Sequence, residues 1–541
     1  MIAVYSFVFA LFVASALVPL LVRWAPRFGL VDLPGPRKIH NVPVPRIGGI
    51  AIMVAALVAM LIFVAPRRDL TAYLAASVVL GVFGVVDDRV NLNYRLKFLG
   101  QIAAALIVVL WGGVLITRWP FTFEALLPVW LAVPCTVFAL VGITNAVNLS
   151  DGMDGLAGGT SLLAAGSLGF LAWLGGDRIT ALFALCLMGA ILGFLRYNTF
   201  PARIFLGDGG SQFLGFSVGV LAIVTVETAN RAISPMVAVL VLGLPILDTV
   251  CVITRRVMEG RSPFSADRCH IHHRLLDLGL NQYEAVVVAY AAQILLVLLA
   301  WRLQYSEDAV LLGTYVMFGV VVLVALRLAE RYGLPHLRTP GYESHITRAV
   351  DLARRHSLTI RVPRQALLIM VPASFVLASV LADSVAADLG WLALALLAGL
   401  LFLLRVRRMP FFAFERLTVY SVAATSVFLL ETSPSVIGIC SPCVRGFFVA
   451  LAVLIGLWLR FGGRRGFEFN AMDLLIIAIV VVLPNVPGIK ETGMGVVAME
   501  TLVLFYASEI IITDHPRGWD ALRYGVTMSL AIIAIRGIVG V

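Results

Sequence analysis

The sequence predicts an all-α polytopic membrane protein. Of its 541 residues, 60% are hydrophobic and only 13% are charged, whereas a soluble domain carries about 25% charged residues. The mean hydropathy is +0.98, and apolar runs long enough to cross a bilayer as helices recur from end to end. The first run, 2–22, has no basic segment before it and no small-residue cleavage site after it. We therefore expect a retained first helix and not a signal peptide.

The apolar runs predict about eighteen spans, about eleven before residue 330 and about seven after residue 365. The first eleven are expected near 2–22, 48–65, 70–86, 98–116, 126–144, 160–175, 180–195, 212–226, 235–253, 285–300 and 308–327. The other seven are expected near 366–382, 389–404, 417–430, 446–459, 473–484, 495–512 and 526–541. Several of the last runs are short, so re-entrant segments are the alternative there.

Basic residues gather in the loops on one side of these spans, as in "DLPGPRKIH" and "DDRVNLNYRLK". The loops on the other side, such as "GGDRI" and "ETANR", carry few of them. Cytoplasmic loops carry an excess of Lys and Arg, so we place the richer face in the cytoplasm and the N-terminus outside. The net charge of +10 therefore reflects topology, and we expect no nucleic-acid partner.

The polar motifs all fall on the predicted cytoplasmic face. They are "DLPGPRKIHNVPVPRIGG" (32–49), "DDRVNLNYRLK" (87–97), "NLSDGMDGLAGG" (148–159), "RYNTFPARIFLGDGGS" (196–211) and "SPFSADRCHIHHRLLDLG" (262–279). A transporter that works by alternating access keeps its key polar groups near the membrane midplane. Polar groups gathered at one face favour an enzyme whose site opens to the cytoplasm.

Carboxylates recur in these motifs. Asp87 and Asp88 end the third predicted span, and Asp151 and Asp154 lie in a glycine-rich turn. Asp208 lies in "GDGGS" directly before a predicted helix, where backbone N–H groups and the positive helix end favour phosphate while the carboxylate holds a metal. Taken singly, these features also fit a solvated helix end or an ordinary glycine turn.

Histidines complete the pattern. "HIHH" contains His270, His272 and His273, flanked by Arg268 and Arg274. Carboxylates, phosphate-binding turns and cations together indicate a magnesium-assisted phosphoryl-transfer site. A divalent cation is useful there because two negative charges about 4 Å apart repel by about 4 kcal/mol at an effective dielectric constant of 20. A zinc site is the alternative interpretation of the histidines, although no cysteine pair accompanies them.

Asp248 lies inside the apolar stretch "LGLPILDTVCVI". A charged residue deep in a bilayer costs about 3 kcal/mol, so an unpaired role there is disfavoured. We expect Asp248 near the cytoplasmic end of its helix, paired with Arg255 or Arg256.

The ordered set "DLPGPRKIH", "VVDDR", "NAVNLSDGMDGLAGG", "FPARIFLGDGGS" and "HIHHRLL" resembles the motifs of the polyprenyl-phosphate N-acetylhexosamine-1-phosphate transferases over about residues 1–330. "HIHH" followed by "RLL" is similar to the WecA/TagO branch of the MraY/WecA superfamily. The resemblance implies a WecA-like transferase fold for the first eleven spans. It also implies transfer of an N-acetylhexosamine-1-phosphate, most simply GlcNAc-1-phosphate, from a UDP-sugar to undecaprenyl phosphate, with release of UMP. Another UDP-N-acetylhexosamine donor, or a transporter of lipid-linked sugar, is the alternative.

The resemblance implies roles for individual residues. Asp87 and Asp88 would be catalytic, one of them as base or nucleophile, while Asp208 and Asp151 would hold Mg²⁺, with Mn²⁺ as the alternative ion. Phe205 would stack on uracil, or else pack. The nucleotide sugar would be bound by Lys38, His40, Asn148, Asp151, Asp154, Asn198, Phe205, Gly207, Arg268, His270, His272, His273 and Arg274. The implied setting is the bacterial cytoplasmic (inner) membrane, in surface polysaccharide synthesis, with a homodimer as the implied oligomer.

The chain continues well beyond the residues that carry the resemblance. We expect a transferase domain at 1–330, a cytoplasmic linker at 331–365 that is amphipathic near Ser344–His356, and a multi-span domain of unknown role at 366–541. The parity of the spans places "CSPC", with Cys440 and Cys443, outside the cytoplasm. Disulfides form and persist on that side of the membrane. The sequence leaves open whether Cys440 and Cys443 are paired.

Overall fold

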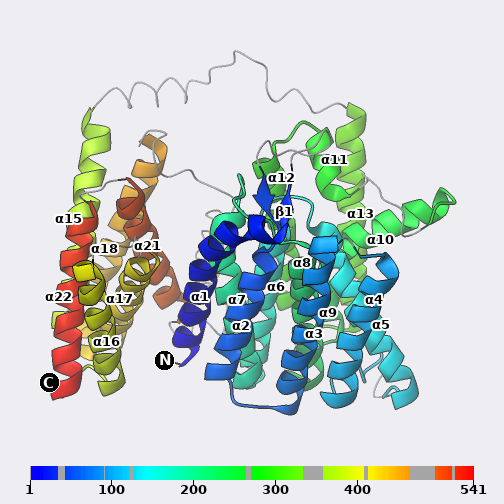
Figure 1. Ribbon diagram of the computed structural model, residues 1–541, viewed down its shortest axis with the longest axis horizontal. Helices are drawn as coiled ribbons and strands as arrows, with labels where there is room; N and C mark the ends of the chain where they lie inside the picture. Colours follow the sequence, from blue (N-terminus) through cyan, green and yellow to red (C-terminus); the bar gives the residue numbers. More distant parts are fainter. Residues whose placement is uncertain are drawn as a thin grey trace. The chain divides into compact units, whose positions relative to one another are not determined.

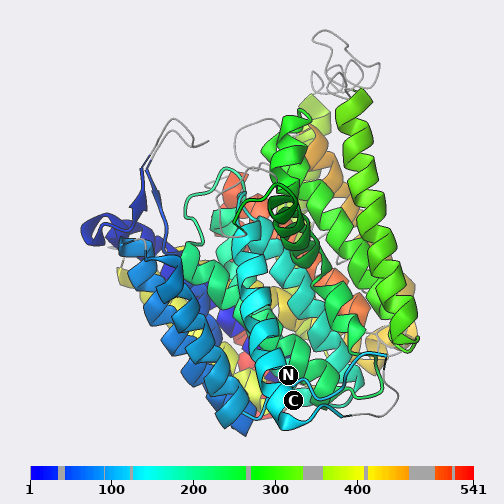
Figure 2. The same ribbon diagram turned by 90° about the vertical axis from the view of Figure 1, so that its right-hand side faces the viewer.

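The computed structural model describes residues 2–33, 43–90, 92–121, 126–262, 270–332, 357–406, 412–461, 494–514 and 518–540. Its regular elements are nearly all helices (Figures 1 and 2). The chain divides into two compact units, Met1–Arg338 with Asn470–Met472 and Thr339–Phe469 with Asp473–Val541. They are called the N-terminal and C-terminal units below.

The N-terminal unit begins with α1 (Ile2–Trp24) and the short helix η1 (Ala25–Phe28). An antiparallel pair, β1 (Val31–Asp32) and β2 (Val44–Pro45), follows. The helices after it are α2 (Gly48–Phe63), α3 (Arg68–Val90), α4 (Tyr94–Leu106), η2 (Ile107–Trp111), α5 (Val129–Ser150), α6 (Leu156–Leu174), α7 (Arg178–Asn198), α8 (Asp208–Val224), η3 (Thr225–Ala229), α9 (Met236–Val241), α10 (Gly243–Met258), α11 (Ile271–Asp277), α12 (Gln282–Arg302) and α13 (Asp308–Tyr332).

Twelve of the described helices are long and apolar enough to cross a membrane, and Gly48–Phe63, Ala387–Leu403 and Pro442–Trp458 are shorter apolar helices. These helices confirm the prediction of an all-helical, multi-pass membrane protein. The predicted count of about eighteen spans exceeds these twelve. The predicted span at 473–484 lies outside the described residues.

The predicted span at 235–253 is interrupted, because the helix breaks at Leu242 into α9 and α10. Pro245 has no N–H group to donate to the carbonyl of Val241, four residues earlier. Gln293 of α12 supplies the missing donor, since its Nε2 donates to Val241 O at 2.6 Å. A contact from a distant helix therefore satisfies the broken backbone.

Helix α8 is the most enclosed of the candidate spans, with 94% of its most apolar window buried. It packs against α2, α3, α5 and α6. Two glycine pairs allow the close approach: a Cβ on Gly49 would lie 2.1 Å from Gly210 Cα, and one on Gly84 would lie 2.3 Å from Gly209 Cα. Small residues at helix contacts let backbones approach closely in membranes. The start of α8 is therefore fixed against α2 and α3.

The C-terminal unit contains α15 (Ser357–Leu381), α16 (Ala387–Val406), α17 (Phe412–Thr432), α18 (Pro434–Phe461), α21 (Met494–Asp514) and α22 (Gly518–Val539). Ion pairs join its helices: Arg523 Nη2 lies 2.9 Å from Glu415 Oε1, and Arg416 Nη2 lies 3.2 Å from Glu509 Oε1. Cys443 lies within α18 and is a free thiol. The predicted amphipathic segment Ser344–His356 lies outside the described residues.

Candidate active site

Three of the sequence motifs meet where α3 ends and α8 begins. Asp208 is the first residue of α8, and Gly207 before it has φ +78°, which suits glycine. A Cβ on Gly207 would lie 2.4 Å from Arg46 O and 2.8 Å from Asp88 Oδ2. Asp88 accepts hydrogen bonds from Asp208 N (2.8 Å) and Gly209 N (3.3 Å). The buried carboxylate of Asp88 therefore holds the glycine-rich turn in place.

Lys97 links the other two carboxylates of this cluster. Its Nζ lies 2.8 Å from Asp87 Oδ2 and 2.8 Å from Asp208 Oδ2. The Asp87 side chain is only 2% exposed, whereas the Asp208 side chain is 42% exposed. Asp87 also accepts a hydrogen bond from Leu92 N at 2.9 Å. Asp208 is thus the carboxylate of this pair that a ligand reaches, and Asp87 lies behind it.

Asn148, at the end of α5, faces the same cluster. Its Nδ2 donates to Ser211 Oγ (2.6 Å) and lies 3.5 Å from Asp208 Oδ1. One turn earlier, Asn145 Nδ2 donates to Gln101 Oε1 (2.6 Å), which belongs to α4. These amides join α4, α5 and α8 and fix the direction of the Asn148 side chain.

The turn between α5 and α6 carries Asp151 and Asp154. Asp151 is half-buried, and burial together with the nearby charges of Asp208, Asp154 and Asp88 raises its pKa to about 8. Asp154 Oδ2 accepts a hydrogen bond from Ala202 N at 3.0 Å. A raised pKa marks a carboxyl group whose negative charge is unfavourable in its surroundings, and a bound cation would offset that cost.

Asn198, expected at the nucleotide, is 4% exposed. Its Oδ1 accepts a hydrogen bond from Gly155 N (3.0 Å) and its Nδ2 donates to Ile204 O (2.9 Å). The hydroxyl of Tyr290 donates to Gly155 O at 2.7 Å. Both side chains therefore stabilise the backbone of the α5–α6 turn.

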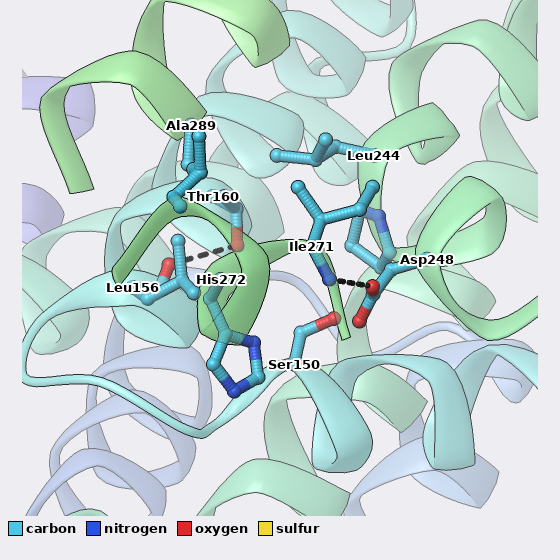
Figure 3. Close-up of a pocket in the computed structure, with 10 residues that line it drawn as sticks. Ser150, Leu156, Thr160, Leu244, Asp248, Ile271, His272 and Ala289 are labelled. Atoms are coloured by element: carbon cyan, nitrogen blue, oxygen red, sulfur yellow. Dashed lines mark hydrogen bonds between the residues drawn. The ribbon is translucent and has the colours of Figure 1, made fainter. Parts of the chain in front are cut away.

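The histidine motif forms the short helix α11 and rests on Asp248. His270 Nδ1 lies 2.8 Å from Asp248 Oδ2. Ile271 N donates to Asp248 Oδ1 at 2.7 Å, as the dashed line in Figure 3 shows. The prediction that Asp248 pairs with Arg255 or Arg256 is wrong: Arg255 instead binds Glu259 at 2.8 Å. The pairing with His270 was not predicted because the fold brings together two residues that lie 22 positions apart in the sequence.

His272 and His273 lie beside His270, with ring centroids of His272 and His273 4.3 Å apart. A Cβ on Gly152 would lie 2.1 Å from His272 Nε2, so the histidine ring packs directly on the α5–α6 turn. Burial, with the neighbouring His273, lowers the pKa of His272 to about 4. His272 is therefore a neutral imidazole at physiological pH. Arg274 binds Glu330 at 2.8 Å.

Four further residues were predicted at the site, and the structure describes one of them, Phe205. Phe205 uses its backbone to pair with β2 and α2: its N donates to Pro45 O (2.7 Å), and its O accepts from Gly48 N (2.9 Å). Lys38, His40 and Arg268 lie outside the described residues.

The carboxylates of this site fit a hard divalent cation as a partial set of ligands, which substrate phosphates would complete. Within the described ranges, no group of three or more His, Cys, Asp and Glu side chains is arranged to hold a metal. Mg²⁺ usually binds through one or two carboxylates plus substrate phosphates. The exposed carboxylate of Asp208, with Asp151 nearby, offers that smaller set. The oxygen ligands suit Mg²⁺ or Mn²⁺ better than a softer ion.

Lys97 and Asp248 are among the residues of the site whose contacts the sequence did not predict. Lys97 lies in "DDRVNLNYRLK", ten residues after Asp87, and was interpreted only as a topology signal. A cation that follows a carboxylate pair across a short loop is the signal that could have indicated it.

Replacing Asp248 is expected to disturb the histidine motif selectively. Asp248→Asn keeps an acceptor for Ile271 N and removes the negative charge beside His270, so we expect kcat/KM to fall about tenfold. Asp248→Ala also leaves Ile271 N without its partner, which costs about 1–3 kcal/mol of stability. Steady-state kinetics and thermal unfolding measure the two effects. Asp277→Asn, an exposed change on α11, is the control, and wild-type kinetics in Asp248→Asn would contradict the assignment.

Comparison with known proteins agrees with this geometry. The profile described as Glycosyl transferase family 4 matches residues 70–226. The "Probable undecaprenyl-phosphate N-acetylglucosaminyl 1-phosphate transferase" of Bacillus subtilis (strain 168) is 35% identical over 335 residues, which cover 61% of this chain and 92% of that protein.

Two further relatives are similar over about half of the chain. The "Undecaprenyl-phosphate alpha-N-acetylglucosaminyl 1-phosphate transferase" of Escherichia coli (strain K12) is 30% identical over 52% of this chain and 79% of its own length. The "Decaprenyl-phosphate N-acetylglucosaminephosphotransferase" of Mycobacterium tuberculosis (strain ATCC 25618 / H37Rv) is 33% identical over 58% of this chain and 86% of its own. The chain belongs to glycosyl transferase family 4, the MraY/WecA superfamily, whose members similar to it are prenyl-phosphate GlcNAc-1-phosphate transferases.

Proposed function

We propose that the N-terminal unit transfers GlcNAc-1-phosphate from UDP-GlcNAc to undecaprenyl phosphate. An oxygen of the lipid phosphate bonds to the sugar-linked phosphorus, the bond from that phosphorus to the bridging oxygen breaks, and UMP leaves. The products are a polyprenyl-diphosphate sugar and UMP. The family membership supports the reaction class, and the names of the relatives support the sugar and the lipid.

The observation that carries the proposal is the convergence of Asp87, Asp88, Lys97, Asn148 and Asp208. These residues come from α3, α4, α5 and α8 and lie within hydrogen-bond distance of one another in a chain of contacts. Anionic, cationic and amide groups at the positive end of α8 suit a diphosphate with its counter-ion. The side chain of Asp208 is 42% exposed, so a ligand can reach it.

Within this site, Asp208 and Asp151 would hold Mg²⁺, with Mn²⁺ as the alternative ion. When bound, the ion would offset charge on the diphosphate. Asp88 positions the "GDGG" turn through its two backbone hydrogen bonds. Asp87 and Lys97 then remain to orient the lipid phosphate or to move a proton.

The nucleotide sugar would lie across the α5–α6 turn and the histidine motif. Asn148, Asp154, Gly207 and Asn198 shape the first surface, with Phe205 at its side. His270, His272 and His273 form the second. Lys38, His40, Arg268 and Arg274 are proposed to supply cationic and polar contacts from the flanking segments.

The proposal places the protein in the bacterial inner membrane with the site facing the cytoplasm and the N-terminus outside. Residues 1–330 would form the transferase domain and 331–365 a cytoplasmic linker. The segment 366–541 would form a separate membrane domain, and the oligomer would be a homodimer.

Purified protein tests the proposal directly. With undecaprenyl phosphate, Mg²⁺ and UDP-GlcNAc, UMP release is expected, and omission of the lipid or chelation of the metal with EDTA should each stop it. Readdition of Mg²⁺ or Mn²⁺ should restore the rate, and UDP-GalNAc in the same assay measures donor choice. Folded, monodisperse protein that releases no UMP from any UDP-N-acetylhexosamine would contradict the proposal.

A further inference from the structure

Glu500 is a carboxyl group inside the helical bundle of the C-terminal unit. It lies on α21, which is long and apolar enough to cross a membrane, and it is 0% exposed. Neither of its oxygens accepts a hydrogen bond from a described residue. An ionised carboxylate without a partner is strongly disfavoured in an apolar interior, so such a group is held neutral by a proton. Glu415 and Glu509 of the same bundle differ from it, because each forms an ion pair with an arginine.

Two charged groups on neighbouring helices act on Glu500. Helices α15, α17, α18 and α22 pack against α21, and the charged groups that they bring to Glu500 are Glu431 of α17 and Arg445 of α18. The Glu431 carboxyl group is close enough to share a proton with Glu500. Arg445, an exposed residue of α18, attracts the ionised form of Glu500. These surroundings suit a carboxyl group that gains and loses a proton.

Three buried serines in the same bundle also lack hydrogen-bond partners. Ser426 of α17, Ser508 of α21 and Ser529 of α22 are at most 1% exposed, and their hydroxyl groups bond to no residue that the structure describes. A buried serine in a helix commonly donates to a carbonyl one turn earlier, as Ser379 of α15 does to Phe375 O at 3.0 Å. Helices α17, α21 and α22 pack pairwise against one another (Figure 1). The three free hydroxyl groups therefore come from helices that pack together.

These polar groups lie at successive depths of the bundle. Two ion pairs mark a common level at one end of it, Arg523–Glu415 and Arg416–Glu509. Ser508 adjoins this level, and Glu431, near the far end of α17, lies roughly 24 Å from it at a helical rise of about 1.5 Å per residue. On the same scale, Ser529, Glu500 and Ser426 lie roughly 9, 14 and 16 Å from the level. Polar groups therefore recur across most of a hydrocarbon core of about 30 Å.

We propose that the C-terminal unit carries protons across the membrane along the contact of α17, α21 and α22, with Glu500 as the group that binds and releases them. Serine hydroxyl groups both donate and accept hydrogen bonds, so with intervening water molecules they pass a proton to Glu500. The O–H bond of the Glu500 carboxyl group forms when the proton arrives and breaks when the proton moves on to Glu431.

A proton suits this arrangement better than a metal ion does. A hard metal cation needs several oxygen ligands at one point, whereas the polar groups here are spread along the bundle. Ionisable residues inside a membrane characteristically mark ion pathways and proton relays. This activity belongs to the C-terminal unit and is separate from the transferase reaction proposed for the N-terminal unit.

Proton flux into proteoliposomes tests the inference. The full-length protein is reconstituted into vesicles that contain a pH-sensitive dye, and a potassium diffusion potential set with valinomycin drives protons inward. We expect the wild-type flux to exceed that of protein-free vesicles and Glu500→Gln to abolish the excess, because glutamine keeps the size of the side chain but binds no proton. Asp388→Asn, a change at an exposed carboxyl group on α16, is the control and should retain the wild-type flux.

The serines give a second test that leaves Glu500 in place. Ser529→Ala should lower the flux several-fold, whereas Ser379→Ala removes an equally buried hydroxyl group that is bonded within its own helix and should not change the flux. Size-exclusion chromatography in detergent establishes that each variant is monodisperse. A wild-type flux no higher than that of protein-free vesicles would overturn the proposal. Equal fluxes in the wild type and Glu500→Gln, or in Ser529→Ala and Ser379→Ala, would also overturn it.

Discussion

Asp208→Asn is expected to abolish UMP release while the protein stays folded. The substitution removes one negative charge at the most exposed carboxylate of the cluster. If the lost attraction to a cation is about 4 kcal/mol, the rate falls roughly a thousandfold. The turn should persist, because Asp88 binds the backbone N–H of residue 208 and not its side chain. The measurement is kcat/KM as a function of Mg²⁺ concentration.

Asp388→Asn provides the matched control, since Asp388 is exposed at the start of α16 in the C-terminal unit. It should retain wild-type kinetics and the same Mg²⁺ dependence. Size-exclusion chromatography and thermal unfolding in detergent establish that both variants are folded. Full turnover in Asp208→Asn would remove Asp208 from the metal site and leave it a structural role at the start of α8.

The location of the spans follows from composition because the bilayer sets a length that an apolar helix must reach. Composition does not say which helix is enclosed by the others, because lipid and protein interior are both apolar. Helix α8 is enclosed on nearly all sides, yet its apolar run resembles those of helices with largely exposed surfaces. The break at Leu242 was missed for a related reason. It depends on Pro245, visible in the sequence, but also on Gln293, a donor that α12 brings from 52 residues away from Val241.

The sequence predicted the candidate site in part, as it did the fold. Asp87, Asp88 and Asp208 stand out as charges in apolar surroundings, and the structure brings them together. The separate role of each carboxylate depends on which of its oxygens accepts a hydrogen bond from which donor. The periodicity of apolar residues in the sequence does not give these contacts. The carboxylate of Asp88 accepts hydrogen bonds from two backbone N–H groups, whereas the side chain of Asp208 is 42% exposed. Asp248 shows the same limit: the sequence indicates that it needs a partner, but only the fold selects His270 over the nearer arginines.

Lys97→Met is expected to affect both stability and catalysis. It leaves Asp87, whose side chain is 2% exposed, without its ammonium partner. Removing one member of a buried pair costs about 3–5 kcal/mol, and the 27% exposure of the Lys97 side chain favours the lower end. We expect kcat/KM to fall about 100- to 1,000-fold, as when one preorganised electrostatic group is lost. Arg95→Met, an exposed loss of charge on the same helix, is the control.

The double variant Lys97→Met/Asp87→Asn separates the two effects. Neutralising Asp87 removes the orphaned buried charge, so most of the lost stability should return, as measured by thermal unfolding in detergent. Asp87 is itself proposed to act on the lipid phosphate, so activity is compared with that of the single variant Asp87→Asn. If Lys97 acts on the substrate phosphates, UMP release should be lower in the double variant than in Asp87→Asn, because the cation near Asp208 is still missing. If Lys97 only neutralises Asp87, the two variants should release UMP at the same rate. Any activity lost beyond that of Asp87→Asn therefore belongs to the contact of Lys97 with the reacting groups.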